Sequence, residues 1–409
     1  MNATNNLNLL LFLFSCWMQN VGRPALLQTM PTALLGLDRE AFNACIASAF
    51  ERENKPLRPY LATQVWQGIH QQGRTDFGKI TNISSSAVSV LQKTLQCGYP
   101  AVKEHLLSQD GTTKWLLDYG DSREIETVFI PQVNRSEVKQ NGAICVSSQV
   151  GCSLACSFCH TGTQKFNGNL TSAQIVGQVM TVMNAVGDFP LSMARSRKIT
   201  NIVYMVALNL KQGQGEPLYN FKNVSAAVLF VNDVFGYAPH RTTISTSGLV
   251  PLMGKISKDL KACLAVSLHA TTDDLRDELV PINKQYPISE LMKGCQSYLD
   301  GLDSPGNQNY RITFEYVMLN GVNDSIEDAK RLVKLIRGFP SHVNLIPFNS
   351  WPGASYQCSS NTKIDLFRKI IIAGGIPCHT RTPRGQDISA ACGQLKSIQD
   401  SKKIAKKLQ

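Results

Sequence analysis

The chain has 409 residues, 43% of them hydrophobic and 17% charged, so it can bury a large core and is expected to form more than one domain. Its formal net charge of +11 indicates a polyanionic partner such as nucleic acid, although many basic proteins bind none. Its 12 cysteines are irregularly spaced, which excludes the disulfide framework of a small secreted domain and indicates a reducing, cytosol-like compartment.

Residues 1–37 are expected to be a leader that lies outside the folded domains. Leu7 to Trp17 form an apolar run too short to span a bilayer, so no membrane partner is expected. No acidic residue precedes Asp38, which is typical of an organellar presequence. Arg23 is the sole basic residue before Asp38, whereas such presequences are rich in arginine. Two interpretations stay open: a presequence for an organelle matrix, with the mitochondrion favoured over the plastid, or a cytoplasmic protein whose N-terminus has no targeting role.

Residues 38–115 are predicted to form a small, separate helical domain. Asp38 can cap a helix that runs through Phe50, and Arg58 to Gln71 has apolar residues at helical spacing. Asn82 to Ser85 offers a further helix cap. Helical domains of this kind bind nucleic acid or serve as scaffolding, and both roles stay open.

From about residue 116 the chain alternates short β-rich strands with helices. Residues 116–137 are expected to be connecting strands, 138–385 the core, and 386–409 a C-terminal segment with a basic tail. Strand–helix alternation predicts an α/β fold built from βαβ units around a parallel sheet, either open or barrel-like. The expected strands are Thr127–Ile130, Ile144–Ser148, Ile202–Met205, Thr243–Ser245, Leu264–Leu268, Ile312–Val317 and Val343–Pro347, and the expected helices are Ala173–Val186, Val224–Phe235, Asp273–Glu278, Ile288–Leu299, Ile326–Arg337 and Ile364–Ala373.

Three cysteines, Cys152, Cys156 and Cys159, follow the second core strand, and Phe158 precedes the last of them. Structural zinc and iron–sulfur clusters usually have four protein ligands, so a triplet leaves one coordination position open. Spacing alone does not name the metal. A zinc site completed by His160 or by a distant cysteine is the alternative to a cluster that binds a further ligand.

The pattern Cys-x3-Cys-x-aromatic-Cys resembles the signature of radical S-adenosylmethionine (SAM) enzymes. Over about residues 57–397, the chain resembles the RlmN family, which methylates carbon 2 of adenine in large-subunit ribosomal RNA and in transfer RNA. The resemblance implies a partial (β/α)6 TIM-like radical SAM barrel with a small N-terminal helical domain that binds RNA. Its motifs are Glu126–Pro131, Cys145–Cys152, Ile312–Asp324 and Ala390–Leu395.

This resemblance also implies a mechanism. Cys152, Cys156 and Cys159 would hold a [4Fe-4S] cluster at which SAM is cleaved to a radical. Cys392 would carry a methyl group from a first SAM, and the radical would activate that methyl for addition to adenine. Glu126 would accept a proton from the adduct. Cys145 would then release the product by forming a disulfide with Cys392.

The same matching implies SAM-binding residues at the ends of the predicted strands, where parallel sheets bind their ligands. An electron donor such as flavodoxin or ferredoxin is also implied, with ribosomal and transfer RNA as partners, and a monomer is expected. The SAM-binding residues would be Gly215, Glu216, Ser245, Ser267, Leu268, His269 and Asn349.

One departure from the family pattern lies beside this predicted SAM site. The family runs from Met through Gly-x-Gly-Glu-Pro without a break, whereas here seven residues, Val206–Gln212, follow Met205 before Gly213. An insertion between a strand and its loop could displace Glu216. A misassigned exon boundary would explain it, because Val codons begin with GT and a Gln codon can end in AG.

Two alternatives to adenine carbon-2 methylation stay open. Cfr-type relatives of the family methylate carbon 8 of the same adenine. A protein of another class, a non-catalytic RNA-binding protein stabilised by a metal, would leave Cys145 and Cys392 as spare thiols.

Overall fold

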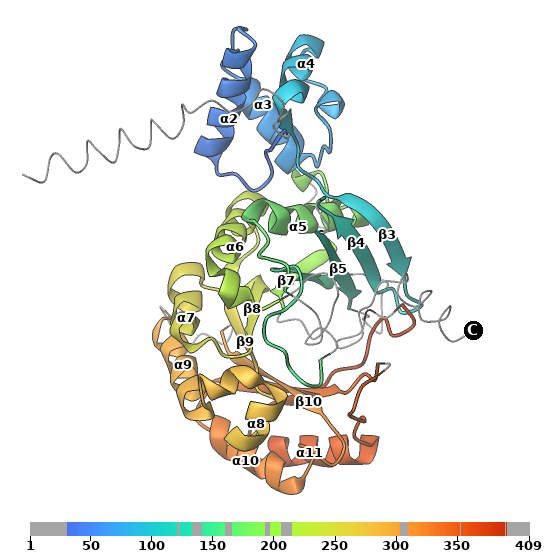
Figure 1. The fold of residues 1–409 in the computed structure, drawn as a ribbon, viewed down its shortest axis with the longest axis vertical. Coiled ribbons are helices and arrows are strands. Elements are labelled where there is room, and N and C mark those ends of the chain that lie inside the picture. Colours follow the sequence, from blue (N-terminus) through green and yellow to red (C-terminus); the bar gives the residue numbers. More distant parts are fainter. Residues whose placement is uncertain are drawn as a thin grey trace, which may run out of the picture.

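The computed structural model describes residues 31–120, 123–132, 141–159, 166–192, 197–205, 215–302, 310–351, 353–388 and 390. Within them, a small helical domain adjoins a larger, curved α/β domain (Figure 1). Residues 1–30, His160, the Val206–Gln212 stretch, Cys392 and the basic tail lie outside the described residues. The predicted leader boundary at residue 37 is too late, because β1 (Thr32–Ala33) pairs with the N-terminal domain and Leu34 and Leu35 are buried.

Helices and one short strand pair form the N-terminal domain, next to α5 and α6 of the larger domain (Figure 1). Two predicted caps are confirmed: Asp38 Oδ1 accepts a hydrogen bond from Ala41 N at 2.8 Å, and Ser84 Oγ accepts one from Ala87 N at 3.3 Å. The elements are β1 (Thr32–Ala33), α2 (Arg39–Arg52), α3 (Leu61–Trp66), the π-helical turn η1 (Gln67–Gln71), the 3-10 turn η2 (Phe77–Lys79), α4 (Ser85–Thr94) and β2 (Leu95–Gln96).

The helices end earlier than the predicted boundary at residue 115. After β2, the chain enters the large sheet through β3 (Ala101–Leu107), β4 (Thr113–Asp118) and β5 (Glu124–Pro131), which pair antiparallel. The strand β3 lies at the edge of the sheet and none of its residues is buried, so its sequence lacks the alternation of a half-buried strand. Its pattern alone could not separate it from the helical part.

The large domain is built on a ten-stranded sheet in the order β12-β11-β10-β9-β8-β7-β6-β5-β4-β3. Strands β6 to β12 are parallel. They are β6 (Gly142–Val146), β7 (Ile199–Tyr204), β8 (Thr242–Thr246), β9 (Cys263–Ser267), β10 (Ile312–Met318), β11 (Ser341–Pro347) and β12 (Cys378–Thr380). The main connecting helices are α5 (Ser172–Val186), α6 (Phe221–Phe235), α7 (Val250–Lys255), α8 (Asp273–Leu279), α9 (Ile288–Asp300), α10 (Ile326–Ile336) and α11 (Asn361–Ala373).

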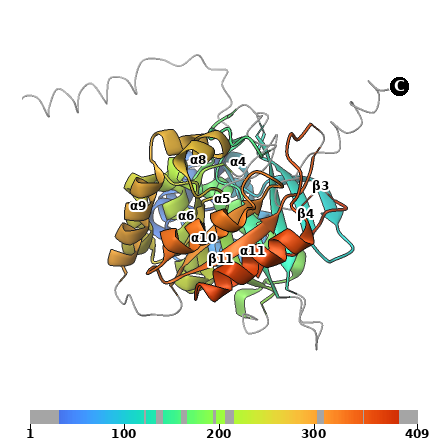
Figure 2. The same ribbon diagram turned by 90° about the horizontal axis from the view of Figure 1, so that it is seen from below.

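Each strand from β6 to β11 is followed by a helix, and the sheet keeps two free edges at β3 and β12, so the predicted partial (β/α)6 barrel is confirmed. The sheet is curved with its helices on the outer side, and α9 and the strands β3 and β4 lie at opposite sides of the domain (Figures 1 and 2). The sequence analysis did not predict β12 or α7. No helix among the described residues is long and apolar enough to cross a membrane.

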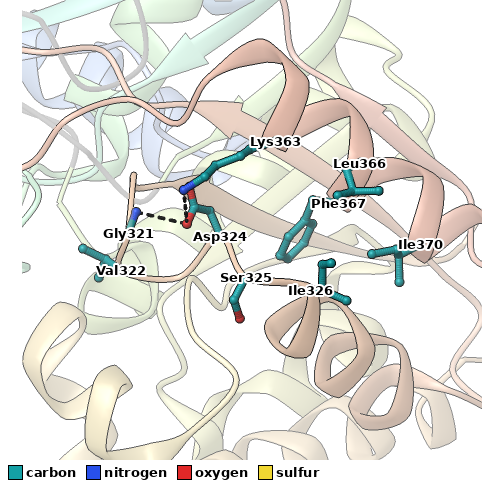
Figure 3. A pocket seen from close by; sticks show the side chains of 9 residues that line it. All are labelled: Gly321, Val322, Asp324, Ser325, Ile326, Lys363, Leu366, Phe367 and Ile370. Atoms are coloured by element: carbon teal, nitrogen blue, oxygen red, sulfur yellow. Dashed lines mark hydrogen bonds and ion pairs between the residues drawn. The ribbon is translucent and has the colours of Figure 1, made fainter.

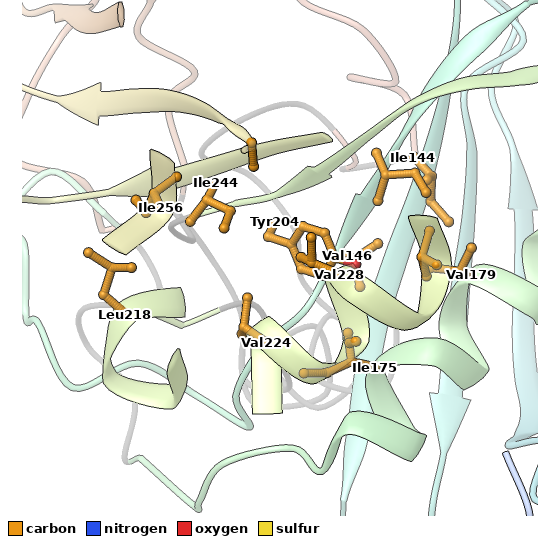
Figure 4. Close-up of a cluster of buried hydrophobic side chains, with 14 of the residues drawn as sticks. Ile144, Val146, Ile175, Val179, Tyr204, Leu218, Val224, Val228, Ile244 and Ile256 are labelled. Atoms are coloured by element: carbon orange, nitrogen blue, oxygen red, sulfur yellow. The ribbon is translucent and has the colours of Figure 1, made fainter. Parts of the chain in front are cut away.

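The two faces of the sheet differ in character. The strand register places Ile144, Tyr204 and Ile244 on one face, where α5 and α6 cover them (Figure 4). Burial of each such side chain contributes about 1.5–3 kcal/mol. The opposite, concave face carries Cys145, which is paired with Val128 of β5, and also Glu126, because residues two apart along a strand share a face. The helices therefore pack on the apolar face, and the polar face lines the interior of the barrel.

Candidate active site

The cysteine loop follows β6 and is packed against the ends of other strands. Cys152, Cys156 and Cys159 are buried, and none forms a disulfide. The Phe158 carbonyl accepts a hydrogen bond from Trp351 Nε1 at 3.3 Å, and the Phe158 ring lies edge-on to His269 at 4.9 Å. Contacts to the residues after β9 and β11 thus fix the position of the loop.

The chemistry of this loop suits a metal cluster. Burial raises the pKa of Cys152 to about 11 and that of Cys156 well above its ordinary value, and the three sulfur atoms repel one another when ionised. A positively charged metal group would stabilise the thiolates and release their protons. In the described part of the chain, no three His, Cys, Asp or Glu side chains are arranged to hold a single metal ion. Three thiolates can hold a cluster in which one further iron stays open to another ligand.

Glu216 lies beside this loop, after the Val206–Gln212 stretch. Its carboxylate accepts hydrogen bonds from Ser247 N at 2.8 Å and Leu218 N at 3.1 Å, and its own N–H donates to Gln149 Oε1 at 2.9 Å. Burial raises the pKa of Glu216 to about 7, and these hydrogen bonds partly oppose the rise. The extra residues therefore leave Glu216 inside the site.

Gly215 brings the backbone close to Gln149. Its φ is +69°, and a Cβ at this position would lie 2.2 Å from Gln149 Oε1. Only glycine fits such a conformation and such an approach without strain. The sequence analysis named Gly215 but missed Gln149, whose position before the cysteine loop was the available signal.

The residues predicted at the ends of β8, β9 and β11 lie at the same end of the sheet. Ser245, Ser267, Leu268 and Asn349 are all buried. The neutral ring of His269 accepts a hydrogen bond from Val317 N at 3.1 Å, since burial lowers its pKa to about 3. Its Nε2 therefore carries the proton, and this buried donor has no partner among the described residues. It is a suitable donor for an oxygen of a bound ligand.

A buried cation, Arg276, ties these strand ends together. Its side chain has no exposed surface and donates to the carbonyl oxygens of Ser247 at 2.7 Å, Ser267 at 3.1 Å and Leu268 at 3.0 Å. It also donates to Asn283 Oδ1 at 2.9 Å, and its charge acts on the Cys156 thiol. The sequence analysis missed Arg276, because an arginine among the acidic residues of α8 is typical of a helix exposed to solvent.

Glu126 and Cys145 share the concave face, on neighbouring strands. Glu126 is buried, with Lys114 Nζ 3.5 Å from its Oε1, while its Oε2 has no hydrogen-bond partner among the described residues. Burial raises the pKa of Glu126 to about 7, against the opposing effect of Lys114. Such a carboxyl can accept a proton near neutral pH.

The C-terminal segment reaches this same face. Ala390 packs with Cys145 and Val128 in a small buried cluster. Asp387 accepts a hydrogen bond from Ser108 Oγ at 2.5 Å and so ties the segment to the β3–β4 turn. Cys392 itself lies outside the described residues, but the chain is held against Cys145 two residues before it.

Comparisons with known proteins agree with this geometry. Residues 32–96 match the model of the ribosomal RNA large subunit methyltransferase N-terminal domain. Two curated relatives are named dual-specificity RNA methyltransferase RlmN: that of Chelativorans sp. is 44% identical over 94% of both chains, and that of Sinorhizobium medicae is 48% identical over 84% of this chain and 82% of its own. The chain belongs to the RlmN family.

A solved structure supports the same assignment. A radical SAM methyltransferase from Sphaerobacter thermophilus superposes with a TM-score of 0.76, at 35% identity, over 89% of this chain and 99% of its own. The chain is therefore an enzyme, a radical SAM methyltransferase of the RlmN family, and the interpretation as a non-catalytic metal-stabilised protein is overturned. The matched N-terminal model ends at residue 96, where the helical domain also ends.

Proposed function

We propose that this RlmN-family enzyme methylates carbon 2 of adenine in large-subunit ribosomal RNA, with transfer RNA as a second substrate. The observation that carries the proposal is the meeting of Glu126, Cys145 and the segment before Cys392 on one face of the sheet. Cys145 and the segment before Cys392 are distant in sequence, yet the fold brings them into contact. The relatives' name supports RNA as the substrate.

One set of residues would bind the cluster and SAM. Cys152, Cys156 and Cys159 would hold a [4Fe-4S] cluster, which together with bound SAM would supply one-electron cleavage and hydrogen abstraction. Gly215, Glu216 and His269 are suited to orient SAM, with Ser245, Ser267, Leu268 and Asn349 completing its surroundings.

Three further side chains handle the methyl group and the proton. The Cys392 thiolate receives the methyl from a first SAM and presents it to the adenine. Glu126 accepts the proton that leaves carbon 2, and its unpaired Oε2 is available for this. The Cys145 thiolate would attack the sulfur of Cys392 and break the bond between that sulfur and the carbon added to the base. A disulfide would form, the released carbon would take up a proton to become the methyl group, and the unpaired electron of the adduct would leave to an electron carrier. A flavodoxin or ferredoxin supplies the electron.

Replacement of Cys145 by alanine tests this division. Without the resolving thiol, RNA is expected to remain covalently attached to the protein after one turnover, visible as a shifted band on a denaturing gel. Cys378→Ala is the matched control, because Cys378 is also a buried strand thiol but its register partner Val343 lies on the apolar face. Release of free methylated RNA by Cys145→Ala contradicts the proposed role.

The position of the methyl group is read separately from digested RNA. Wild-type enzyme is expected to yield 2-methyladenosine, which mass spectrometry with chromatography separates from the carbon-8 isomer. A product methylated at carbon 8 would favour the Cfr-like alternative.

We also propose a monomer that works in a reducing compartment, with the mitochondrial matrix favoured over the plastid and the cytoplasm as the location if residues 1–37 carry no signal. Fluorescence microscopy of a C-terminal fusion tests the location, and sedimentation tests the monomer. A cytoplasmic signal that is unchanged on removal of residues 1–30, which leaves β1 in place, would refute the organellar location.

A further inference from the structure

A hollow of about 400 Å³ opens between the end of β5, the end of β11 and the segment that follows β12. Its wall includes Asn349, a predicted SAM contact, and Ala390, which packs with Cys145. Pockets of this size accommodate a group as large as a nucleotide. The hollow therefore adjoins the predicted site of chemistry.

Two arginines, Arg381 and Arg384, come from the same short segment and line this hollow. Arg381 N donates to Leu345 O at 2.8 Å, and Gly385 N donates to Asp110 Oδ2 at 2.9 Å, so both ends of the segment are anchored. Pro383 stiffens the backbone between the arginines. The two guanidinium groups are thus presented from a fixed backbone.

The two arginines differ in their ion pairs. Arg381 Nη1 lies 3.5 Å from Glu315 Oε2. No carboxylate of the described residues forms an ion pair with Arg384, which is half-buried. A similar-sized hollow of about 410 Å³ between α10 and α11 differs, because its Lys363 pairs with the buried Asp324 at 3.1 Å (Figure 3). The hollow beside Cys145 therefore presents an arginine, Arg384, that forms no ion pair with a carboxylate of the described residues.

We propose that Arg381 and Arg384 bind the phosphates that flank the target nucleotide, so that the base enters through this hollow toward Cys145. The proposal rests on the proposed function and extends it to the RNA contact. A guanidinium presents paired donors that match phosphate oxygens. An enzyme that modifies a base must hold it out of the stack, and backbone contacts fix the strand while it does so.

The test measures binding of the reconstituted full-length protein to a fluorescent RNA hairpin at several salt concentrations. Arg384→Ala is expected to weaken binding about tenfold, the effect of one charged hydrogen bond, and to lower the salt slope by about 0.7–0.9. Arg384→Lys keeps the charge and is expected to lose less affinity with an unchanged slope. The control is Arg368→Ala on α11, which also removes one partly exposed arginine but does not line the hollow, and it is expected to bind like wild type.

Two results would overturn the proposal: an Arg384→Ala affinity and salt slope equal to those of Arg368→Ala, or a loss of SAM affinity in place of RNA affinity. The second result would assign the arginines to the SAM carboxylate. A different result would refute the proposed function itself: wild-type protein that is saturated with RNA but yields no 2-methyladenosine. Binding and product are measured on the same samples, so the two failures are distinguishable.

Discussion

Glu126 makes a quantitative prediction about the pH dependence of methyl transfer. Burial raises its pKa from 4.5 to about 7, with Lys114 partly opposing the rise. At that pKa, about 10% of the carboxyl is ionised at pH 6 and about 90% at pH 8, whereas an ordinary carboxyl is almost fully ionised at both. Because only the carboxylate can accept the proton, methylated adenine is expected to form about ninefold faster at pH 8 than at pH 6.

The assay is a single turnover with wild-type enzyme, in which methylated adenosine and 5′-deoxyadenosine are measured together by mass spectrometry. The 5′-deoxyadenosine forms before the proton leaves, so it serves as an internal control for earlier steps. Glu126→Gln is expected to form 5′-deoxyadenosine but little methylated product at any pH. A flat ratio of the two products between pH 6 and pH 8, or full product from Glu126→Gln, refutes Glu126 as the base.

Three stability predictions follow from other contacts. The folded-state pKa of Glu126 is raised above its unfolded value of 4.5, so its contribution to stability is greatest below pH 4.5 and declines by about 3 kcal/mol as the pH rises through 7. Urea unfolding of Glu126→Gln across this pH range is expected to show a free energy of unfolding without that part of the decline. Identical pH profiles for the variant and the wild type would contradict the burial of Glu126. Arg276→Lys loses the guanidinium that binds three carbonyl oxygens at the ends of β8 and β9. It is expected to cost about 2–4 kcal/mol and to weaken SAM binding, with Arg331→Lys on α10 as the control. Gly215→Ala places a methyl group against Gln149 and is expected to cost at least about 1 kcal/mol and to weaken SAM binding, which thermal melting and equilibrium dialysis would detect.

The sequence predicted those helices and strands in which burial imposes a pattern of apolar residues. Strands such as Leu264–Leu268 are nearly all apolar because both faces of a parallel strand are covered, and helices such as α10 carry one apolar stripe. The edge strand β3 and the three-residue β12 were missed, because each has too little burial to impose a pattern. The resemblance to a family, in contrast, named site residues that no periodicity could have found.

Residues that act through other residues could not be predicted. Arg276 lies in the sequence Asp273-Asp-Leu-Arg-Asp-Glu278, which is typical of a solvated helix, yet its side chain is fully buried. Lys114 precedes the apolar run Trp115-Leu116-Leu117, but its ammonium lies in the barrel beside Glu126. Both positions depend on partners distant in sequence, so local composition carries no signal for them.

The meeting of Glu126 and Cys145 depends on one strand register. Side chains alternate between the faces of a sheet, so a shift of one residue between β5 and β6 would turn Cys145 toward the apolar helices. Gly142 stands opposite Pro131 at the start of this pairing, where a Cβ would lie 2.3 Å from Ile130 O. The register also shifts between Gly142 and Ala143 where β6 pairs with β7. Gly142, which has no side chain, therefore helps to set which face of the sheet receives Cys145, three residues further along the chain.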